Sequence, residues 1–189
     1  MSASLAGRRV LVSAGPTYED IDPVRFLGNR SSGRMGFALA AAAASLGAET
    51  VLVAGPVRLE TPPGVRRIDV RSAADMHEAV LCGLPADFYI GAAAVADWTP
   101  RGVASHKLKK QPGVDTLTLV LVRTADILAD VAAHPSRPRC VVGFAAETGD
   151  DADIARYARG KLERKRVDFI CANRVGVAGS GFEAEDNTL

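Results

Sequence analysis

Residues 25–36, RFLGNRSSGRMG, lead directly into the alanine-rich segment 37–46, FALAAAAASL. The alanines and the neighbouring apolar residues recur with helical spacing, which predicts a helix from about Gly33 to Leu46. Gly47 follows at the position where glycine commonly ends a helix. A helix so rich in alanine can pack closely on a neighbouring sheet.

The start of this helix has the composition of an anion-binding site. Ser31 or Ser32 can cap the helix, and Gly33 would let a phosphate approach backbone N–H groups at the positive end of the helix dipole. A capped helix that only packs against a sheet is the alternative. Asn29 favours the anion site, because arginines stand near it on both sides.

Outward from this stretch, strand and helix signals alternate along the chain. Apolar or β-branched runs predict strands at 9–14, 49–54, 67–70, 88–94, 140–145 and 168–172. Further helices are expected at 72–84, 124–131 and 151–165, with Ser72, Thr124 and either Thr148 or Asp150 as N-caps. Short connections indicate a mostly parallel sheet with helices on both faces. The expected fold class is α/β, three-layered and Rossmann-like.

Three segments interrupt this alternation. Residues 18–32 form a long irregular connection, and connections of that length are more often functional than structural. Residues 99–114 carry proline, glycine and the basic run KLKK at 107–110, which predicts a mobile loop. Residues 116–122, TLTLVLV, alternate cleanly and predict an antiparallel or edge strand.

Composition limits the class of protein. The 189 residues are 48% hydrophobic and 24% charged, which suits one well-buried domain. A formal net charge of +1 argues against a dedicated nucleic-acid or membrane-surface binder. The three cysteines lack CxxC spacing and stand in or beside apolar runs, so we expect inert thiols in a reducing compartment. With no signal peptide and no apolar span of about 18 residues, we expect a cytoplasmic protein.

The strand ends predict where a ligand binds. In a parallel sheet, ligands lie beyond the carboxyl ends of the strands, where the strand order switches. Residues 15–17, 91–97 and 143–147 each follow a predicted strand and share that edge with the 25–36 stretch and the helix start near Thr124. These segments offer backbone N–H groups and cations with few acids, which predicts a cleft for a nucleotide polyphosphate.

The common phosphate motifs are absent from the sequence. Only Gly15 follows the first strand, where a dinucleotide fingerprint needs G-x-G-x-x-G, and no Walker Gly-Lys-Ser/Thr occurs. Tyr157 and Lys161 have the Y-x-x-x-K spacing of short-chain dehydrogenases, a pattern that often arises by chance. An NAD(P)-dependent dehydrogenase-like oxidoreductase and a non-catalytic nucleotide-binding module remain as alternatives.

From about Arg9 onward, six motifs in order closely resemble those of bacterial phosphopantothenate–cysteine ligase. They are AGPT at 14–17, DPVR at 22–25, NRSSGRMG at 29–36, AAVAD at 93–97, KLKK at 107–110 and GFAAET at 143–148. The resemblance implies a coenzyme A biosynthetic enzyme. CTP would activate the carboxylate of 4′-phosphopantothenate as an acyl-cytidylate, with release of pyrophosphate. The amine of L-cysteine would then attack the acyl carbon, and CMP would leave.

The resemblance also implies a set of nucleotide-binding residues. Backbone groups of Gly91, Ala92 and Ala93 would face the CTP, and Asp97 would contact a ribose hydroxyl. The other expected contacts are Lys107, Ala125, Asp126, Ile127, Leu128, Phe144, Lys161 and Lys165, together with Gly15, Ser31, Ser32 and Gly33. Without the resemblance, Asp97 would be interpreted as a turn cap, Phe144 as core, and the two helical lysines as a solvated basic face.

Three residues are expected to act in the reaction itself. The Asn29 amide can donate to a developing carbonyl oxyanion without adding charge. The Arg25 guanidinium suits the phosphate or carboxylate of phosphopantothenate, and Lys107 should become ordered over the bound triphosphate. No acidic or histidine cluster has metal-ligand spacing, so Mg²⁺ is expected to be carried mainly by the triphosphate and water.

Three departures from the family pattern bear on these expectations. The family usually has proline at the position of Ala125. Many bacterial relatives carry an N-terminal flavin-dependent decarboxylase half, and relatives continue beyond Leu189 for roughly one strand-and-helix unit. We therefore expect residues 1–189 to form a single synthetase domain, truncated at the C-terminus and lacking the decarboxylase half. The family pattern also implies a homodimer and a larger assembly with that decarboxylase domain.

Overall fold

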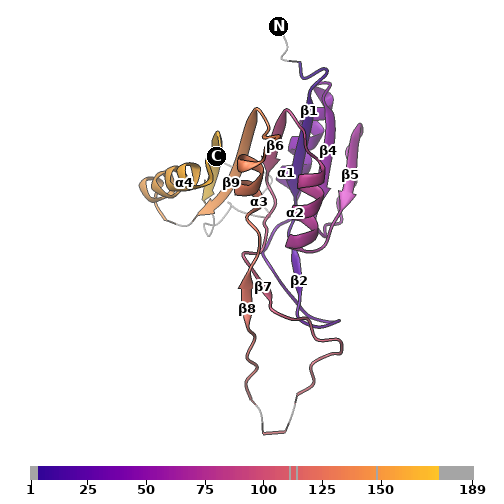
Figure 1. Ribbon diagram of the computed structural model, residues 1–189, viewed down its shortest axis with the longest axis vertical. Helices are drawn as coiled ribbons and strands as arrows, with labels where there is room; N and C mark the ends of the chain where they lie inside the picture. The colour runs from indigo at the N-terminus through magenta and orange to yellow at the C-terminus, as the bar shows by residue number, and fades with distance from the viewer. Residues whose placement is uncertain (1–3, 111, 114, 148, 175–189) are drawn as a thin grey trace.

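The computed structural model describes residues 4–110, 112–113, 115–147 and 149–174. Its central sheet has six parallel strands (Figure 1). In spatial order they are β5 (Val65–Asp69), β4 (Glu49–Ala54), β1 (Arg9–Ala14), β6 (Phe88–Gly91), β9 (Cys140–Glu147) and β10 (Phe169–Arg174). Numbered along the chain, these six strands follow the order 3-2-1-4-5-6 of a doubly wound Rossmann sheet. The order reverses between β1 and β6, which is where a ligand site is expected.

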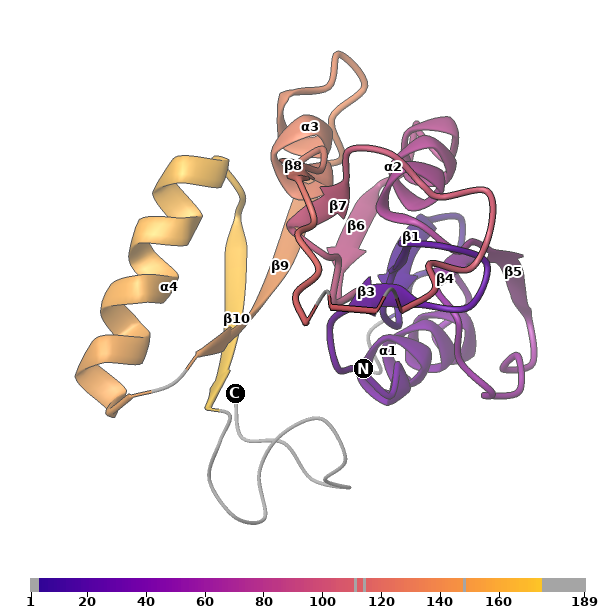
Figure 2. The same ribbon diagram turned by 90° about the horizontal axis from the view of Figure 1, so that it is seen from below.

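Helices lie on both faces of the sheet, as the sequence predicted. Figure 2 shows α1 (Arg34–Ser45) on one face and α2 (Ala73–Cys82) with α3 (Ile127–Ala133) on the other. The last helix, α4 (Asp151–Lys165), packs along β10 and contacts α3. The α/β, Rossmann-like fold class is therefore confirmed.

Two apolar cores result from the alternation of side chains along the strands. Val10 and Val12 of β1 pack with Phe37 of α1, whereas Leu11 points to the opposite face and packs with Met76 of α2. All of these side chains are buried. The middle of the sheet is covered on both sides, which explains the continuous apolar runs in the sequence.

Helix α1 approaches β1 unusually closely at Gly36. A Cβ atom built on Gly36 would lie 2.4 Å from the Cβ of Ala14 and 3.2 Å from its Cα. Only glycine can bring the helix backbone this near to the strand. The first turn of α1 is thereby held directly beside the carboxyl end of β1.

The helix start differs from the serine cap that the sequence predicted. The N-cap is Gly33, with φ 77°, and it makes no side-chain capping bond. Ser31 Oγ accepts a hydrogen bond from the Gly33 N–H at 3.3 Å. A left-handed backbone at the cap favours glycine, because a Cβ atom would be strained there. The turn into the helix is therefore a backbone feature, and the prediction that Ser31 or Ser32 is the cap was wrong.

Two antiparallel hairpin-like pairs extend below the sheet in Figure 1. Strands β2 (Tyr18–Asp20) and β3 (Phe26–Gly28) pair within the segment that was expected to be irregular. Strands β7 (Trp98–Pro100) and β8 (Leu121–Arg123) pair across the base of a long projecting loop. The predicted strand 116–122 is thus antiparallel, but only its last residues form it. The backbone pairing continues one residue past Pro100, where the Arg101 N–H donates to the Val120 carbonyl at 2.9 Å.

The start of α3 also differs from the prediction. Helix α3 is capped by Asp126, whose side chain accepts from the Ala129 N–H, and not by Thr124. The Thr124 hydroxyl donates instead to the carbonyl of Ala96 at 2.6 Å. Ser72 and Asp75 form a complete capping box at α2, and Asp150 caps α4. The alternative cap at Thr148 lies outside the described residues.

Candidate functional site

A cavity of about 620 Å³ lies where the carboxyl ends of β6 and β9 meet the start of α3 and the inner face of α4. Its volume is in the usual range for small-molecule sites, roughly 300–1,000 Å³. The cavity adjoins the switch point between β1 and β6, so it occupies the place that the fold favours for a ligand.

The cavity gathers most of the residues that the resemblance assigned to nucleotide binding. They come from four separate parts of the chain. The predicted residues among its lining are Gly91, Ala93, Asp97, Ala125, Asp126, Ile127, Leu128, Phe144, Lys161 and Lys165. The structure therefore brings together ten residues that are spread over 75 positions of the sequence.

Six lining residues were not predicted. They are Ser13, Tyr89, Val95, Trp98, Arg123 and Thr124. Ser13 and Tyr89 lie inside apolar strand runs and were indistinguishable from core residues. Trp98 and Arg123 come together only because β7 pairs with β8, and the guanidinium of Arg123 lies 5.7 Å from the centroid of the Trp98 ring. Arg123 is the register partner of Trp98 but lies 25 positions away in the chain, so their contact leaves no local sequence signal.

The floor of the cavity is a pair of hydroxyl groups. Ser13 Oγ and the Tyr89 hydroxyl are 3.0 Å apart and both residues are buried. Burial raises the pKa of Tyr89 to about 12, and its hydrogen bond with Ser13 opposes this only in part. The pair is therefore uncharged at neutral pH and offers hydrogen bonds without charge to a ligand.

Two lysines of α4 form one wall. Lys161 Nζ donates to the carbonyl oxygen of Phe144 at 2.8 Å, and Lys165 Nζ pairs with the Asp126 carboxylate. Burial lowers the pKa of both lysines, while the carboxylate of Asp97 opposes that shift at each of them. The two side chains are thus partly withdrawn from water beside the cavity, which separates them from the exposed basic residues of the same helix.

The segment 95–97 is held by side chains from three other regions. Asn29 Nδ2 donates to the Val95 carbonyl at 2.8 Å. The Thr17 hydroxyl accepts from the Ala96 N–H at 3.0 Å, and the Thr124 hydroxyl donates to the Ala96 carbonyl. These bonds fix the backbone on the N-terminal side of Asp97, whose carboxylate lies at the cavity.

The remaining predicted site residues do not line the cavity. They are Gly15, Arg25, Asn29, Ser31, Ser32, Gly33, Ala92 and Lys107. Ala92 donates its N–H to the Ser13 carbonyl, and Gly15 accepts from Ala94, so these two residues join the ends of β1 and β6. Arg25 does not present a free guanidinium, because it is paired with Asp22. Lys107 is exposed, in a segment whose neighbours are bonded to the β2–β3 hairpin.

Tyr157 and Lys161 do not form a common site. Lys161 lines the cavity, but Tyr157 does not, and its side chain is exposed with Arg156 over its ring. A dehydrogenase would need the tyrosine hydroxyl and the lysine to face the same substrate. This arrangement gives the dehydrogenase alternative no support.

The search for metal and membrane features covers the described residues alone. Among them, no three His, Cys, Asp or Glu side chains are grouped so that they could hold a metal ion. Within the same residues, no helix has the length and apolar character needed to cross a bilayer. Cys82, Cys140 and Cys171 are free thiols, and burial raises the pKa of the last two.

Comparison with known proteins agrees with the motif resemblance. The family model "DNA/pantothenate metabolism flavoprotein C-terminal domain" matches residues 5–189. The chain is 54% identical over 186 residues to the coenzyme A biosynthesis bifunctional protein CoaBC of Vibrio cholerae, covering 98% of this chain and 46% of that protein. It is 52% identical over 190 residues to CoaBC of Bacillus subtilis, covering 100% of this chain and 45% of that protein. The chain spans less than half the length of these relatives.

Solved structures give the same result. The crystal structure of the C-terminal domain of a CoaBC protein matches with a TM-score of 0.77 and 42% identity, covering 91% of this chain and 80% of that one. A mutant of Cab2 in complex with phosphopantothenate-cysteine matches with a TM-score of 0.70 at 16% identity, covering 89% of this chain and 73% of that one, which shows the fold alone. The chain therefore belongs to the DNA/pantothenate metabolism flavoprotein C-terminal domain family.

Proposed function

We propose that this chain is a phosphopantothenate–cysteine ligase of coenzyme A biosynthesis and that it uses CTP. The observation that carries the proposal is the gathering of ten residues, assigned to nucleotide binding by the resemblance, around one cavity beside the strand switch point. Relatives that are 54% and 52% identical to this chain are named as coenzyme A biosynthesis proteins, which supports a role in that pathway. A neighbour of the same fold is bound to phosphopantothenate-cysteine, which supports the product.

The nucleotide would occupy the cavity. Its base and ribose would lie against Gly91, Phe144 and Asp97, and its phosphates would approach the two α4 lysines. Lys165 is paired with Asp126, so an incoming phosphate would compete with that carboxylate for the ammonium group. Such a site supplies charge neutralisation and position, which is most of what a phosphoryl-transfer step needs from a protein.

The reaction would proceed in two displacements. A carboxylate oxygen of phosphopantothenate attacks the α-phosphorus of CTP, and the bond to pyrophosphate breaks. The cysteine nitrogen then attacks the acyl carbon, loses a proton and forms the amide, while CMP leaves with the electron pair. Asn29 lies at the edge of this region and uses one amide hydrogen on Val95. Its second hydrogen would be available to the developing oxyanion.

Mg²⁺ would accompany the triphosphate. The carboxylates at the cavity are those of Asp97 and Asp126, and Asp126 is already occupied by Lys165 and by the helix cap. This donor set suits a Mg²⁺ ion that keeps several waters and is held largely by phosphate oxygens. The metal would neutralise charge on the triphosphate while the lysines hold it in place.

The active species would be a homodimer in the cytoplasm, part of a larger assembly with a flavin-dependent decarboxylase domain. The two hairpins support self-association, because exposed large apolar side chains concentrate on them. Those side chains are Val24, Phe26, Trp98, Val103, Leu117, Val120 and Leu121. Light scattering at rising protein concentration tests this part, and a monomer at micromolar concentration would contradict it.

The decisive experiment measures pyrophosphate release from protein, Mg²⁺, phosphopantothenate and L-cysteine with each nucleoside triphosphate in turn. We expect CTP to support turnover far better than ATP. Omission of cysteine should leave one burst of pyrophosphate and no ligated product. Equal rates with CTP and ATP would exclude CTP specificity, and binding without any turnover would favour a non-catalytic nucleotide-binding module.

A further inference from the structure

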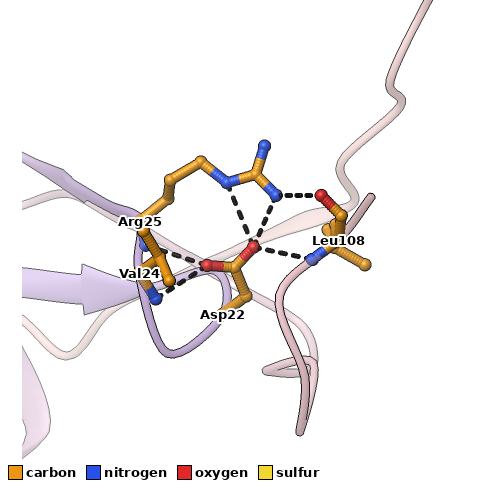
Figure 3. A network of polar contacts seen from close by, with 4 residues as sticks. All are labelled: Asp22, Val24, Arg25 and Leu108. Carbon is orange, nitrogen blue, oxygen red and sulfur yellow. Dashed lines mark hydrogen bonds and ion pairs between the residues drawn. The ribbon is translucent and has the colours of Figure 1, made fainter. Parts of the chain in front are cut away.

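The Asp22 carboxylate is the centre of a polar network that joins two distant parts of the chain (Figure 3). The Asp22 side chain is fully buried, with 0% of its surface exposed. Its Oδ1 accepts from the backbone N–H groups of Val24 and Arg25, both at 2.9 Å. Its Oδ2 accepts from Arg25 Nε at 3.0 Å, from Arg25 Nη2 at 2.5 Å and from the Leu108 N–H at 3.0 Å.

The two carboxylate oxygens of Asp22 accept hydrogen bonds from different parts of the chain. Oδ1 serves only the turn between β2 and β3, two and three residues further along the chain. Oδ2 reaches Leu108, 86 residues away. Arg25 Nη2 completes the link by donating to the Leu108 carbonyl at 2.8 Å. Both backbone polar groups of Leu108 are therefore held by the Asp22–Arg25 pair.

A second contact fixes the same segment on its other side. The Ala104 N–H donates to the Ile21 carbonyl at 3.0 Å. Lys107 lies between these two attachment points and directly precedes Leu108 in the chain. Within the part of the chain that the structure describes, its exposed side chain makes no hydrogen bond or ion pair, so its position depends on the backbone on either side of it.

We propose that Asp22 is a positioning residue that holds Lys107 for its contact with the nucleotide phosphates. This inference rests on the proposed function, because it assigns Lys107 to the triphosphate of CTP. Asp22 and Arg25 form a fixed ion pair, and the carboxylate orients the guanidinium so that the pair holds the peptide groups on both sides of Leu108. The Lys107 backbone is thereby placed before the nucleotide arrives, so that only its side chain would become ordered over the bound triphosphate.

The competing explanation is that Asp22 only stabilises the hairpin. The two explanations can be tested separately, because Oδ1 bonds within the turn whereas Oδ2 bonds to Leu108. Asp22→Asn can keep Oδ1 for the turn while it places an NH₂ group opposite the Leu108 N–H and the guanidinium. Donor then faces donor, so the link to Leu108 is lost. Asp20→Asn is the matched control, since Asp20 belongs to the same hairpin but pairs with Arg71, outside it, and not with residues 104–108.

The first measurement is independent of activity. Amide hydrogen exchange in peptides that cover residues 104–110 should become faster in Asp22→Asn and remain unchanged in Asp20→Asn. Leu108→Pro removes the N–H from the other side of the contact and serves as a second variant if Asp22→Asn does not fold. Unchanged exchange in a folded Asp22→Asn protein would overturn the proposal, whether or not the chain is a ligase.

The second measurement is kinetic. Asp22→Asn should lower kcat for pyrophosphate release by about tenfold to a hundredfold, the loss expected from a misplaced catalytic group. Combined with Lys107→Gln, it should add little further loss, because both changes remove the same contact. Fully multiplicative losses in the double variant would show that Asp22 does not act through Lys107. Absence of pyrophosphate release by the wild-type chain would instead reject the proposed function itself.

Discussion

The side-chain amide of Asn29 and the backbone carbonyl of Val95 are joined by a hydrogen bond of 2.8 Å. This bond connects the glycine- and serine-rich stretch before α1 to the segment that follows β6. Asn29 does not line the cavity, yet Val95 does. The amide therefore influences the site through the backbone that carries Asp97, in addition to any contact that it makes with a substrate.

Asn29→Asp should slow ligation by about two orders of magnitude, the loss seen when one oxyanion donor is removed. The new carboxylate would face an anionic acyl-cytidylate and could not donate to Val95. Rapid quench with labelled CTP would show which displacement suffers. The control is Thr124→Val, which removes a different bond to the same segment. Ligation by Asn29→Asp at the wild-type rate would contradict a catalytic role.

Lys107→Gln should reduce kcat for pyrophosphate release and leave the melting temperature within a degree or so of the wild type, because exposed substitutions rarely change stability. The Lys107 side chain is exposed and the contacts of its segment are made by backbone groups of Ala104 and Leu108. Thermal melts and stopped-flow pyrophosphate assays measure the two effects. A large drop in melting temperature would show that Lys107 is structural.

Gly36→Ala should destabilise the protein by about 1–3 kcal/mol, the usual cost of overpacking. The added methyl would collide with Ala14, so α1 must move away from β1. Urea unfolding measures the change. Gly102→Ala is the matched control, since nothing lies within 4 Å of a Cβ at that position. Equal stability of the two variants would mean that the helix shifts without cost.

The contribution of Asp22 to stability should depend on pH in a defined direction. Hydrogen bonds from Arg25 hold the pKa of the Asp22 carboxyl well below its usual range in the native state. Its stabilising effect is thus complete above the unfolded value of about 3.9 and is lost as pH falls toward the lower native value. The stability difference between the wild type and Asp22→Asn should be constant from about pH 5 to 7 and should narrow below pH 4.

Chemical denaturation at pH 7, 5, 4 and 3 would measure that difference. Asp20→Asn is again the control, because Arg71 also lowers the pKa of Asp20 but the pair is exposed. The difference in free energy of unfolding between the wild type and Asp20→Asn should be small at every pH, as is usual for exposed ion pairs. A difference for Asp22→Asn that grows as the pH falls from 5 to 3 would have the wrong sign for a carboxylate with a lowered pKa.

The sequence was sufficient for the parallel sheet, its helices and the edge where the cavity lies. The strands at 9–14 and 49–54 contain the continuous apolar runs VLV at 10–12 and VLVA at 51–54 because both faces of the sheet are covered, and that pattern is visible locally. The cap of α1 was misjudged because Gly33 adopts a left-handed backbone, whereas two serines beside it offered a more familiar signal.

The β2–β3 hairpin could not be predicted for a different reason. Strands β2 and β3 are three residues each, and their pairing is supported by Tyr18 stacked on Phe26 with centroids 3.8 Å apart. Neither ring stands in a run long enough to show a period. The contact between Asp22 and Leu108 is even harder to predict from local sequence, because it joins residues 86 positions apart. Similarly, Ser13 and Tyr89 face the cavity from strands that otherwise contribute to the core.

The residues that line the cavity range from Ser13 to Lys165, so they are drawn from segments spread over most of the described chain. During synthesis, Ser13 at the floor of the cavity is made first, and the two lysines of α4 are made last. A nascent chain that has formed β1, β6 and α3 would therefore still lack the two lysines of that wall. Under the proposed function, tight nucleotide binding would require α4 to have docked, so it would indicate that synthesis and folding of this domain have reached α4.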